Sequence, residues 1–267
     1  MKVFTIINPT QKRIPIVVSV PHCGVQFPEE VRDQFNPELI KNPEDTDWFV
    51  DRLYDFAPSL GITMIHSVFS RWVIDLNRDP ESKPLYSDGR IITGLCPTQA
   101  FSGEKLYRDH RMEVDPSEVI RRLEKYYIPY HQKLQEILDD LKSEFGKVLL
   151  WDCHSVRQYV PSIHKEKFSD LILGDAEGAA ASPQIIEVAY KNLGDDVYSL
   201  SHNYPFMGGY ITRHFGKPLQ NQQALQLEMS KITYMDDNEI TYDQAKADKM
   251  KRHLIKTFNA LHQTLIS

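Results

Sequence analysis

Two short apolar runs in this chain are each followed closely by a histidine. Residues 14–20 (IPIVVSV) are rich in β-branched side chains, and His22 comes two positions later. Residues 148–151 (VLLW) show no helical periodicity, and we expect their strand to stop at Asp152, just before His154. Such runs predict strands buried on both faces, as in parallel sheets covered by helices. Because ligands bind at the carboxyl ends of such strands, the two histidines are candidate ligands of one metal ion. Either could instead be a hydrogen-bonded structural residue.

Further patterns predict the other elements of an α/β fold. Runs of β-branched residues predict strands, and apolar residues at three- and four-residue steps predict helices. The additional predicted strands are 1–7 (at a sheet edge), 62–68, a strand beginning at 70, 171–174, 197–203 and 224–229. The predicted helices are 46–61, 116–145, 183–193 and 242–265, with a long loop region at 81–115 and a glycine-containing loop at 208–216.

The longest amphipathic stretch, residues 116–145, leads directly into the strand at 148–151. Pro116 fits its first turn, Gly146 fits its C-terminal cap, and Pro129 should kink the helix or divide it in two. The succession of strand, helix and strand is that of a βαβ unit. With no internal repeat or linker, we expect a single α/β domain over residues 1–267, with a mixed, mostly parallel central sheet flanked by helices.

Composition narrows the classes of function. Of the 267 residues, 41% are hydrophobic and 25% charged, which is typical of a globular protein with a substantial core. The net charge of −6 gives no reason to expect a nucleic acid or a membrane as partner, and no apolar run approaches the roughly 20 residues of a membrane span. Three cysteines without CxxC spacing, and no signal-peptide pattern, lead us to expect a reduced, cytoplasmic protein. The GxGxxG, Walker, GxSxG and HExxH motifs do not occur.

A hydrolytic zinc site needs three protein ligands and an open position for water. With His22 and His154 as the first two, the third should be a carboxylate that follows the first strand. We favour Asp47, because we expect it in the first turn of the helix at 46–61, although it could equally serve there to stabilise the helix dipole. The other candidates are Glu29, Glu30 and Asp45.

Polar side chains near other strand ends are candidates for substrate binding. Arg71, Asn77 and Arg78 flank the apolar residues 72–74, so this segment should be partly buried. An arginine fork binds a carboxylate through two hydrogen bonds, and asparagine adds a neutral donor. Asp75 and Asp79 could instead simply neutralise these arginines. Arg213 with His214 forms another possible anion-binding pair.

Glu228 lies near the end of the strand predicted at 224–229. A carboxylate beside a metal-bound water can accept its proton and pass it to a leaving group, so Glu228 is a candidate general base. On pattern alone it could also be an ordinary outward-facing strand residue.

Seven segments, in order along nearly the whole chain, resemble the N-formylglutamate amidohydrolase family. They are PHCG, DTDWFVDRLY, SRWVIDLNRDP, TGLCP, WDCHS, GGYITRHFG and LQLEMSKITYM. That family is distantly similar to zinc carboxypeptidases and aspartoacylases. The resemblance implies a zinc-carboxypeptidase-like (phosphorylase/hydrolase-like) fold, one zinc ion, and hydrolysis of N-formyl-L-glutamate to formate and L-glutamate in histidine degradation.

The resemblance also implies roles for single residues. His22 and His154 resemble the zinc histidines, and Asp47 the carboxylate ligand. In the distant relatives this carboxylate lies three residues after the first histidine, where this chain has Val25, so Asp45 stays an alternative. Arg71 resembles an arginine that steadies the oxyanion, and Glu228 the catalytic glutamate. The substrate-binding positions implied are Asn77, Arg78, Tyr210 and Arg213.

Two other functions remain open. One is a zinc-dependent hydrolase of another N-acyl amino acid or small peptide, which an assay over a panel of acyl groups would distinguish. The other is a non-catalytic anion-binding protein of the same fold, which metal analysis would distinguish. In each case we expect a small anionic ligand, no nucleic acid and no membrane. The sequence indicates no oligomeric state.

Overall fold

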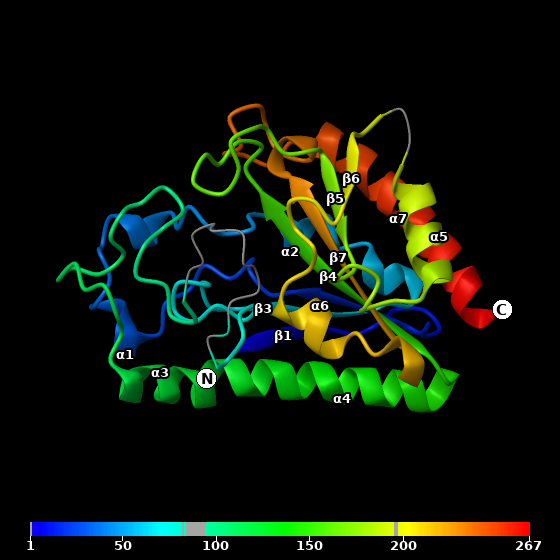
Figure 1. Ribbon diagram of the computed structural model, residues 1–267, viewed down its shortest axis with the longest axis horizontal. Coiled ribbons are helices and arrows are strands. Elements are labelled where there is room, and N and C mark those ends of the chain that lie inside the picture. Colours follow the sequence, from blue (N-terminus) through cyan, green and yellow to red (C-terminus); the bar gives the residue numbers. More distant parts are fainter. Residues whose placement is uncertain (1, 82, 84–93, 195–196) are drawn as a thin grey trace.

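The computed structural model describes residues 2–81, 83, 94–194 and 197–267. Within these residues one seven-stranded sheet has the order β1-β3-β2-β4-β7-β5-β6 (Figure 1). β2, β3, β4 and β7 pair in parallel and β5 pairs in parallel with β6, while β1–β3 and β5–β7 are antiparallel. The predicted mixed, mostly parallel sheet is therefore confirmed. The strands are β1 Phe4–Ile7, β2 Ile16–Val20, β3 Thr63–Ser67, β4 Val148–Val156, β5 Leu171–Gly174, β6 Leu200–His202 and β7 Gln222–Ser230.

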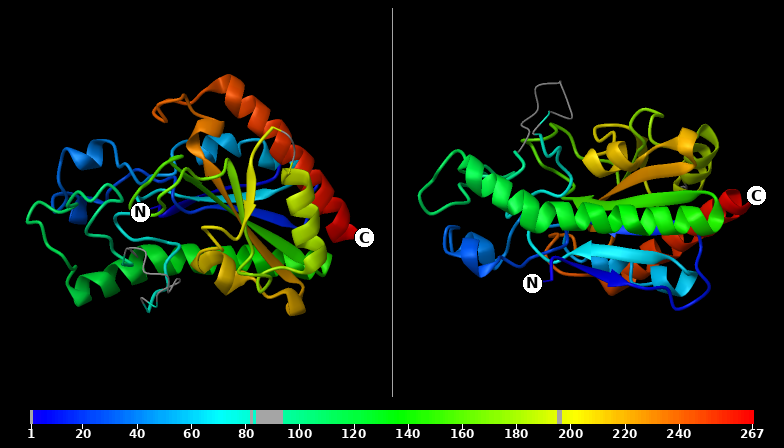
Figure 2. Two further views of the ribbon diagram at one scale, coloured as in Figure 1. Left: turned by 45° about the horizontal axis from the view of Figure 1, so that its top comes forward. Right: turned by 90° about the horizontal axis from the view of Figure 1, so that it is seen from below.

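Helices cover both faces of the sheet (Figures 1 and 2). Apolar residues of α2, α5 and α7 pack on one face, against side chains such as Trp151, and those of α4 and α6 pack on the other, against side chains such as Leu150. The α-helices are α1 Glu29–Arg32, α2 Val50–Leu53, α3 Pro116–Arg122, α4 Ile128–Phe145, α5 Pro183–Leu193, α6 Tyr210–Phe215 and α7 Gln244–Ile266, and 3₁₀ turns lie at Leu39–Lys41, Ala57–Leu60, Pro218–Gln220 and Lys231–Thr233. None of the helices in the described ranges combines the length and apolar character that a membrane crossing requires.

The predicted long helix is confirmed as three consecutive helical segments. Pro116 opens α3 after Asp115, whose side chain accepts a hydrogen bond from the Ser117 N–H at 2.8 Å. A π-helical turn, Leu123–Tyr127, joins α3 to α4 just before Pro129. Proline lacks an N–H and its ring crowds the carbonyl four residues back, so the wider turn accommodates it where an interruption was expected. Gly146 ends α4 with φ 77°, a conformation that favours glycine.

The helix predicted over residues 46–61 is wrong in its extent. α2 spans only four residues, and Phe49 before it has φ 62°, which interrupts any helix started at Asp47. A separate 3₁₀ turn, Ala57–Leu60, follows. Asp47 therefore does not lie in a first helical turn; instead its backbone N–H donates to the His22 carbonyl at 3.0 Å. The local apolar pattern is right, but a contact between distant segments fixes the backbone.

Three further boundaries differ from prediction. β4 does not stop at Asp152 but continues to Val156, because β7 pairs with it along its full length. No strand begins at Ser70, since the segment that follows forms turns. Residues 210–215 of the predicted loop form α6. The loop predicted at 81–115 is confirmed over residues 94–115, which contain only isolated bridges, while residues 82 and 84–93 lie outside the described residues.

Candidate metal centre

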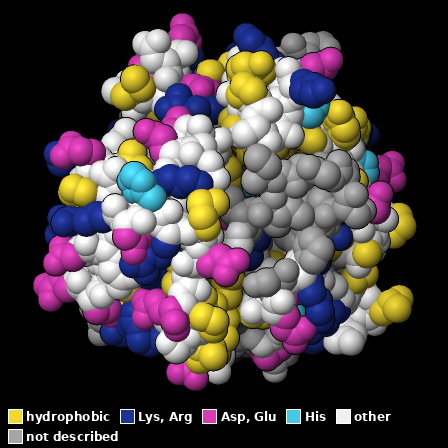
Figure 3. Space-filling view, turned by 60° about the vertical axis from the view of Figure 1, so that its left-hand side comes forward, with side chains coloured by type: hydrophobic (Ala, Val, Ile, Leu, Met, Phe, Trp, Pro, Cys, Tyr) yellow, Lys and Arg dark blue, Asp and Glu magenta, His cyan; other side chains and the backbone are white. Residues whose placement is uncertain are grey.

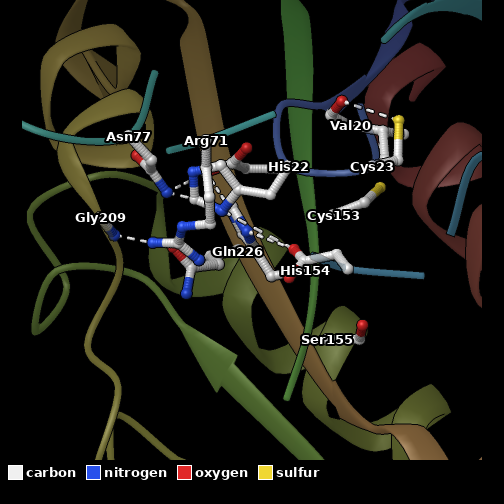
Figure 4. A network of polar contacts seen from close by, with 12 residues as sticks. Val20, His22, Cys23, Arg71, Asn77, Cys153, His154, Ser155, Gly209 and Gln226 are labelled. Carbon is white, nitrogen blue, oxygen red and sulfur yellow. Dashed lines mark hydrogen bonds and ion pairs between the residues drawn. The ribbon is translucent and has the colours of Figure 1, made fainter. Parts of the chain in front are cut away.

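The predicted site residues come together where three adjacent parallel strands end. His22 follows β2 by two residues, His154 lies in β4, and Glu228 lies in β7 opposite His154 in the strand register. Figure 4 shows His22 and His154 converging, with Arg71 and Asn77 beside them. On the face in Figure 3 basic and acidic side chains are interspersed over the surface.

His22, Asp47 and His154 form a compact group of metal-ligand type. Their candidate ligand atoms all lie within 4.8 Å of one another, and all three residues are buried. His154 Nδ1 lies 3.1 Å from Asp47 Oδ2, and His22 Nδ1 lies 3.7 Å from the same oxygen. His22 Nδ1 is buried without any hydrogen-bond partner. A buried polar atom of this kind needs a partner, and two imidazole nitrogens with one carboxylate are a donor set that suits zinc.

The outer nitrogen of each histidine contacts its own carboxylate. His22 Nε2 lies 2.8 Å from Asp75 Oδ1, and His154 Nε2 lies 3.1 Å from Asp152 Oδ2. Carboxylates in this position fix the tautomer and ring orientation of metal-ligating histidines, leaving both Nδ1 atoms facing Asp47. Sequence reasoning did not assign these two roles. For Asp152 a signal existed, since it lies two residues before His154 and so projects from the same face of the strand.

Charges within the group determine its protonation. Burial favours a neutral imidazole at His154, but the carboxylates of Asp152 and Asp47 outweigh it and raise its pKa well above the usual value. Burial also opposes the charge of Asp47, yet the His154 hydrogen bond and the charge of His22 hold the pKa of Asp47 below its usual value. For His22, burial and the nearby Arg71 guanidinium lower the pKa, so its imidazole is neutral. Metal binding requires neutral imidazoles and an ionised carboxylate, so His154 would release its proton when a metal ion binds.

Glu228 is buried beside this group. Burial raises the pKa of Glu228 to about 8, with His154 acting in the opposite direction and Asp47 adding to the rise. A carboxyl group whose pKa lies close to physiological pH can both accept and return a proton there.

Asp45, the alternative third ligand, is held elsewhere. Its Oδ2 accepts from the Trp72 indole N–H at 2.8 Å, and its Oδ1 accepts from the Phe101 backbone N–H at 3.1 Å. Among the described residues, Asp45 is not a member of the ligand group around His22. The geometry therefore favours Asp47.

A second group with metal-ligand atoms exists in the described part of the chain. Cys23, Asp51 and His66 place one candidate atom each within 4.8 Å of the others. Cys23 is adjacent to His22 in sequence, so metal analysis has to separate the two groups.

The predicted arginines lie around Asp75. Arg71 is buried, and its Nη2 donates to Asp75 Oδ2 at 2.6 Å. Arg78 Nε lies 3.8 Å from the same oxygen. Burial opposes the charge of Asp75, but Arg71 and Arg78 outweigh it and hold the pKa of Asp75 well below its usual value. The neutralisation that the sequence left open as an alternative is therefore present, together with the contact to His22.

Asn77 connects the metal-ligand group to α6. Its amide nitrogen lies 2.9 Å from His154 Nε2, and its amide oxygen accepts from the Ile211 N–H at 2.7 Å. The approach is so close that a Cβ on Gly209 would lie 2.3 Å from the Asn77 amide nitrogen, so only glycine fits there.

Tyr210 and Arg213 lie on α6, close to this connection. The Tyr210 hydroxyl is 3.1 Å from His214 Nδ1, and the Tyr210 ring is 6.3 Å from that of Tyr127. Arg213 Nε donates to the Gly208 carbonyl at 2.9 Å. Arg213 and His214, which were expected on a loop, therefore lie on a short helix, where His214 contacts Tyr210.

Comparisons with known proteins agree over most of the chain. A sequence model of the family described as N-formylglutamate amidohydrolase matches residues 14–235. The chain is 39% identical over 254 residues to an N-formylglutamate deformylase of Pseudomonas putida, covering 94% of this chain and 93% of that protein. It is 41% identical over 226 residues to an N-formylglutamate deformylase of Pseudomonas aeruginosa, covering 84% of each. The crystal structure of an N-formylglutamate amidohydrolase from Ralstonia eutropha JMP134 superposes with a TM-score of 0.81 at 25% identity, covering 98% of this chain and 97% of that one.

Proposed function

The chain belongs to the N-formylglutamate amidohydrolase family, and from that premise we propose that it hydrolyses N-formyl-L-glutamate to formate and L-glutamate. Relatives at about 40% identity, named N-formylglutamate deformylases, support this substrate. The reaction adds the oxygen of water to the formyl carbon and breaks its bond to nitrogen, and the amine takes up a proton as it leaves.

We propose that one zinc ion is held by His22, Asp47 and His154. The observation that carries this assignment is the buried His22 Nδ1, which has no hydrogen-bond partner and lies beside Asp47. Asp75 and Asp152, on the outer nitrogens of the histidines, support it as orienting groups. When bound, zinc would supply Lewis acidity, polarising the formyl carbonyl and lowering the pKa of a water molecule to around 7.

Glu228 is the proposed general base and acid. It would accept a proton from the attacking water and return it to the amide nitrogen, which can then leave as an amine. Its place opposite His154 in adjacent parallel strands puts the carboxyl group beside the ligand group. Arg71, whose burial is offset by Asp75, Asp47 and Asp45 so that its pKa is raised, stays charged and is proposed to stabilise the developing oxyanion.

Arg78, Asn77, Tyr210 and Arg213 are proposed to bind the glutamate portion of the substrate. Arginine can hold a carboxylate through two parallel hydrogen bonds, which fixes orientation as well as affinity. The Asn77 amide oxygen is already used by Ile211, so any contact from Asn77 to substrate would come from its amide nitrogen.

We further propose that residues 1–267 act as one catalytic domain and that the reaction belongs to histidine degradation in the cytoplasm. The family match over residues 14–235 supports the first point. The unpaired state of Cys23, Cys96 and Cys153 supports a reducing compartment.

The test is a substrate panel measured with and without a chelator. N-Formylglutamate should be turned over far faster than N-acetylaspartate or a short peptide, and the chelator should abolish the activity. A stronger activity on another acyl group would favour the related zinc hydrolase. Purified protein with neither bound metal nor zinc-dependent turnover would favour the non-catalytic binding protein.

A further inference from the structure

A cavity of about 410 Å³ adjoins the proposed metal centre. Asp45, Ser155 and Lys231 contribute to its lining, and they lie within three residues of Asp47, His154 and Glu228 respectively. Phe101 also lines it, and the Arg71 guanidinium lies 5.1 Å above the Phe101 ring. In Figure 4 Ser155 lies on the opposite side of His154 from Asn77. The cavity is large enough for part of a small substrate.

The most unusual side chain in the lining is the lysine. Lys231 is only 3% exposed, and its Nζ donates to the Thr46 carbonyl at 2.8 Å. In the described part of the chain no ion pair of Nζ with a carboxylate accompanies this hydrogen bond. A neutral carbonyl satisfies one donor but does not neutralise a buried ammonium group, which is costly to leave unpaired. Burial accordingly lowers the pKa of Lys231, although Asp47 acts against the shift.

The acidic groups that line the cavity already have hydrogen-bond or ion-pair partners. Asp45 accepts hydrogen bonds from Trp72 and Phe101, as described above. Glu44 Oε1 lies 3.5 Å from Arg157 Nε, which is itself buried without a hydrogen bond. Arg157 Nη1 also lies 3.7 Å from Glu239 Oε2, so among the described residues Lys231 is the cation in the lining without an ion pair, and its charge favours an anionic ligand.

We infer that this cavity binds the side-chain carboxylate of the substrate's glutamate portion and that the Lys231 ammonium group is the cation that recognises it. The inference rests on the proposed function. N-Formylglutamate carries two carboxylates, separated by the α carbon and two methylene groups. Arg78, whose Nε lies 3.8 Å from Asp75 Oδ2, is then left to bind the carboxylate next to the amide. Two cationic positions flanking one reaction centre would select an amino acid with an acidic side chain.

The test compares two lysine variants on two substrates. Lys231→Met removes both charge and hydrogen bond, whereas Lys231→Gln removes the charge but keeps a donor for the Thr46 carbonyl. Both variants should raise KM for N-formylglutamate by roughly 10- to 100-fold, with kcat and zinc content little changed, since a charge-assisted hydrogen bond is lost. KM for N-formylglutamine, whose side chain is an amide, should hardly change. Lys165→Met, at an exposed position, is the charge-matched control and should match wild type.

Other outcomes would overturn the inference. Equal losses on the acid and the amide, with zinc content lowered in Lys231→Met and restored in Lys231→Gln, would make Lys231 a positioning residue for the segment that carries Asp47. If the Lys231 variants instead raised KM for N-formylglutamine, which keeps the carboxylate next to the amide bond, and left KM for N-formylisoglutamine unchanged, the assignments of Lys231 and Arg78 would be reversed. Absence of wild-type turnover would overturn the proposed function itself, whereas turnover without the selective KM effect would overturn only the cavity's role.

Discussion

His154 on β4 and Glu228 on β7 are direct partners in the register of two adjacent parallel strands. Both strands are buried over all nine of their residues, so this pairing is part of the rigid core. Adjacent strands lie about 4.8 Å apart, which places a proposed metal ligand and a proposed general base side by side. The spacing between them is thus set by backbone hydrogen bonds and does not depend on a loop.

Glu228→Gln should separate chemistry from binding. The amide keeps the shape of the side chain but cannot accept a proton, so kcat should fall by roughly 10²- to 10⁴-fold. Zinc content and KM should stay close to wild type, because Glu228 is not one of the proposed ligands. Steady-state kinetics with metal analysis on the same sample provide the check, and an unchanged kcat would make Glu228 a structural strand residue.

Asp47→Asn and Asp45→Asn form a matched pair for the third ligand. Asp47 lies against both histidines, whereas Asp45 is bonded to Trp72 and Phe101. Zinc occupancy after dialysis should therefore fall much more in Asp47→Asn than in Asp45→Asn. The reverse ranking would transfer the ligand role to Asp45.

Arg78→Lys conserves charge but removes the arginine fork. Lysine cannot reproduce a contact with two parallel hydrogen bonds, so KM for N-formylglutamate should rise by roughly 5- to 150-fold, equivalent to about 1–3 kcal/mol. In N-formylisoglutamine an amide replaces the carboxylate next to the formamide bond, so KM for this substrate should change little in Arg78→Lys. If KM rises equally for both substrates, Arg78 serves only to neutralise Asp75, and Arg213 becomes the next position to test.

His131 should make stability depend on acid pH. Its ring stacks on those of Tyr127 and Phe215, with centroids 4.0 and 5.7 Å away, and burial lowers its pKa to about 3. In the unfolded chain the imidazole has a pKa of about 6.5 and takes up a proton below that pH, whereas in the folded protein it stays neutral down to about pH 3. The free energy of unfolding therefore falls as the pH drops from 6.5 towards 3. At pH 5 the loss should reach about 2 kcal/mol.

His131→Phe keeps an aromatic ring without the titrating group. Denaturant unfolding at pH 7 and pH 5 should show a smaller difference between the two pH values for this variant than for wild type. An identical pH dependence in both proteins would exclude His131 as the source.

The fold could be predicted from the sequence where the local pattern and the tertiary structure agree. β5 and α5 match their predicted ranges because an apolar run and an amphipathic stripe were each bounded by turn residues. The backbone of residues 46–61 could not be predicted from the local sequence. The positive φ of Phe49 and the hydrogen bond from Asp47 to the His22 carbonyl depend on segments that are distant in the sequence. A period of hydrophobicity cannot report a backbone that is set by another segment.

The candidate site could be predicted from the sequence to a similar extent. His22 and His154 could be found because strand ends mark where side chains meet ligands. Asp75 and His22 are separated by 53 positions in the sequence, and Lys231 and Thr46 by 185 positions. No local sequence pattern could therefore predict these contacts. Asp152 was accessible through the two-residue period of a strand, once His154 was recognised.

The most direct test of the metal centre measures zinc content and N-formylglutamate turnover in the same preparations of wild type, His22→Ala and His154→Ala. His66→Ala, in the second group with Cys23 and Asp51, is the control. We expect about one zinc ion per chain in wild type and in the control, because two histidines and one carboxylate with an open position form one zinc site. His22→Ala and His154→Ala should each lose both zinc and turnover. Stoichiometric zinc with full turnover in either His22→Ala or His154→Ala would contradict a zinc ion held by these histidines.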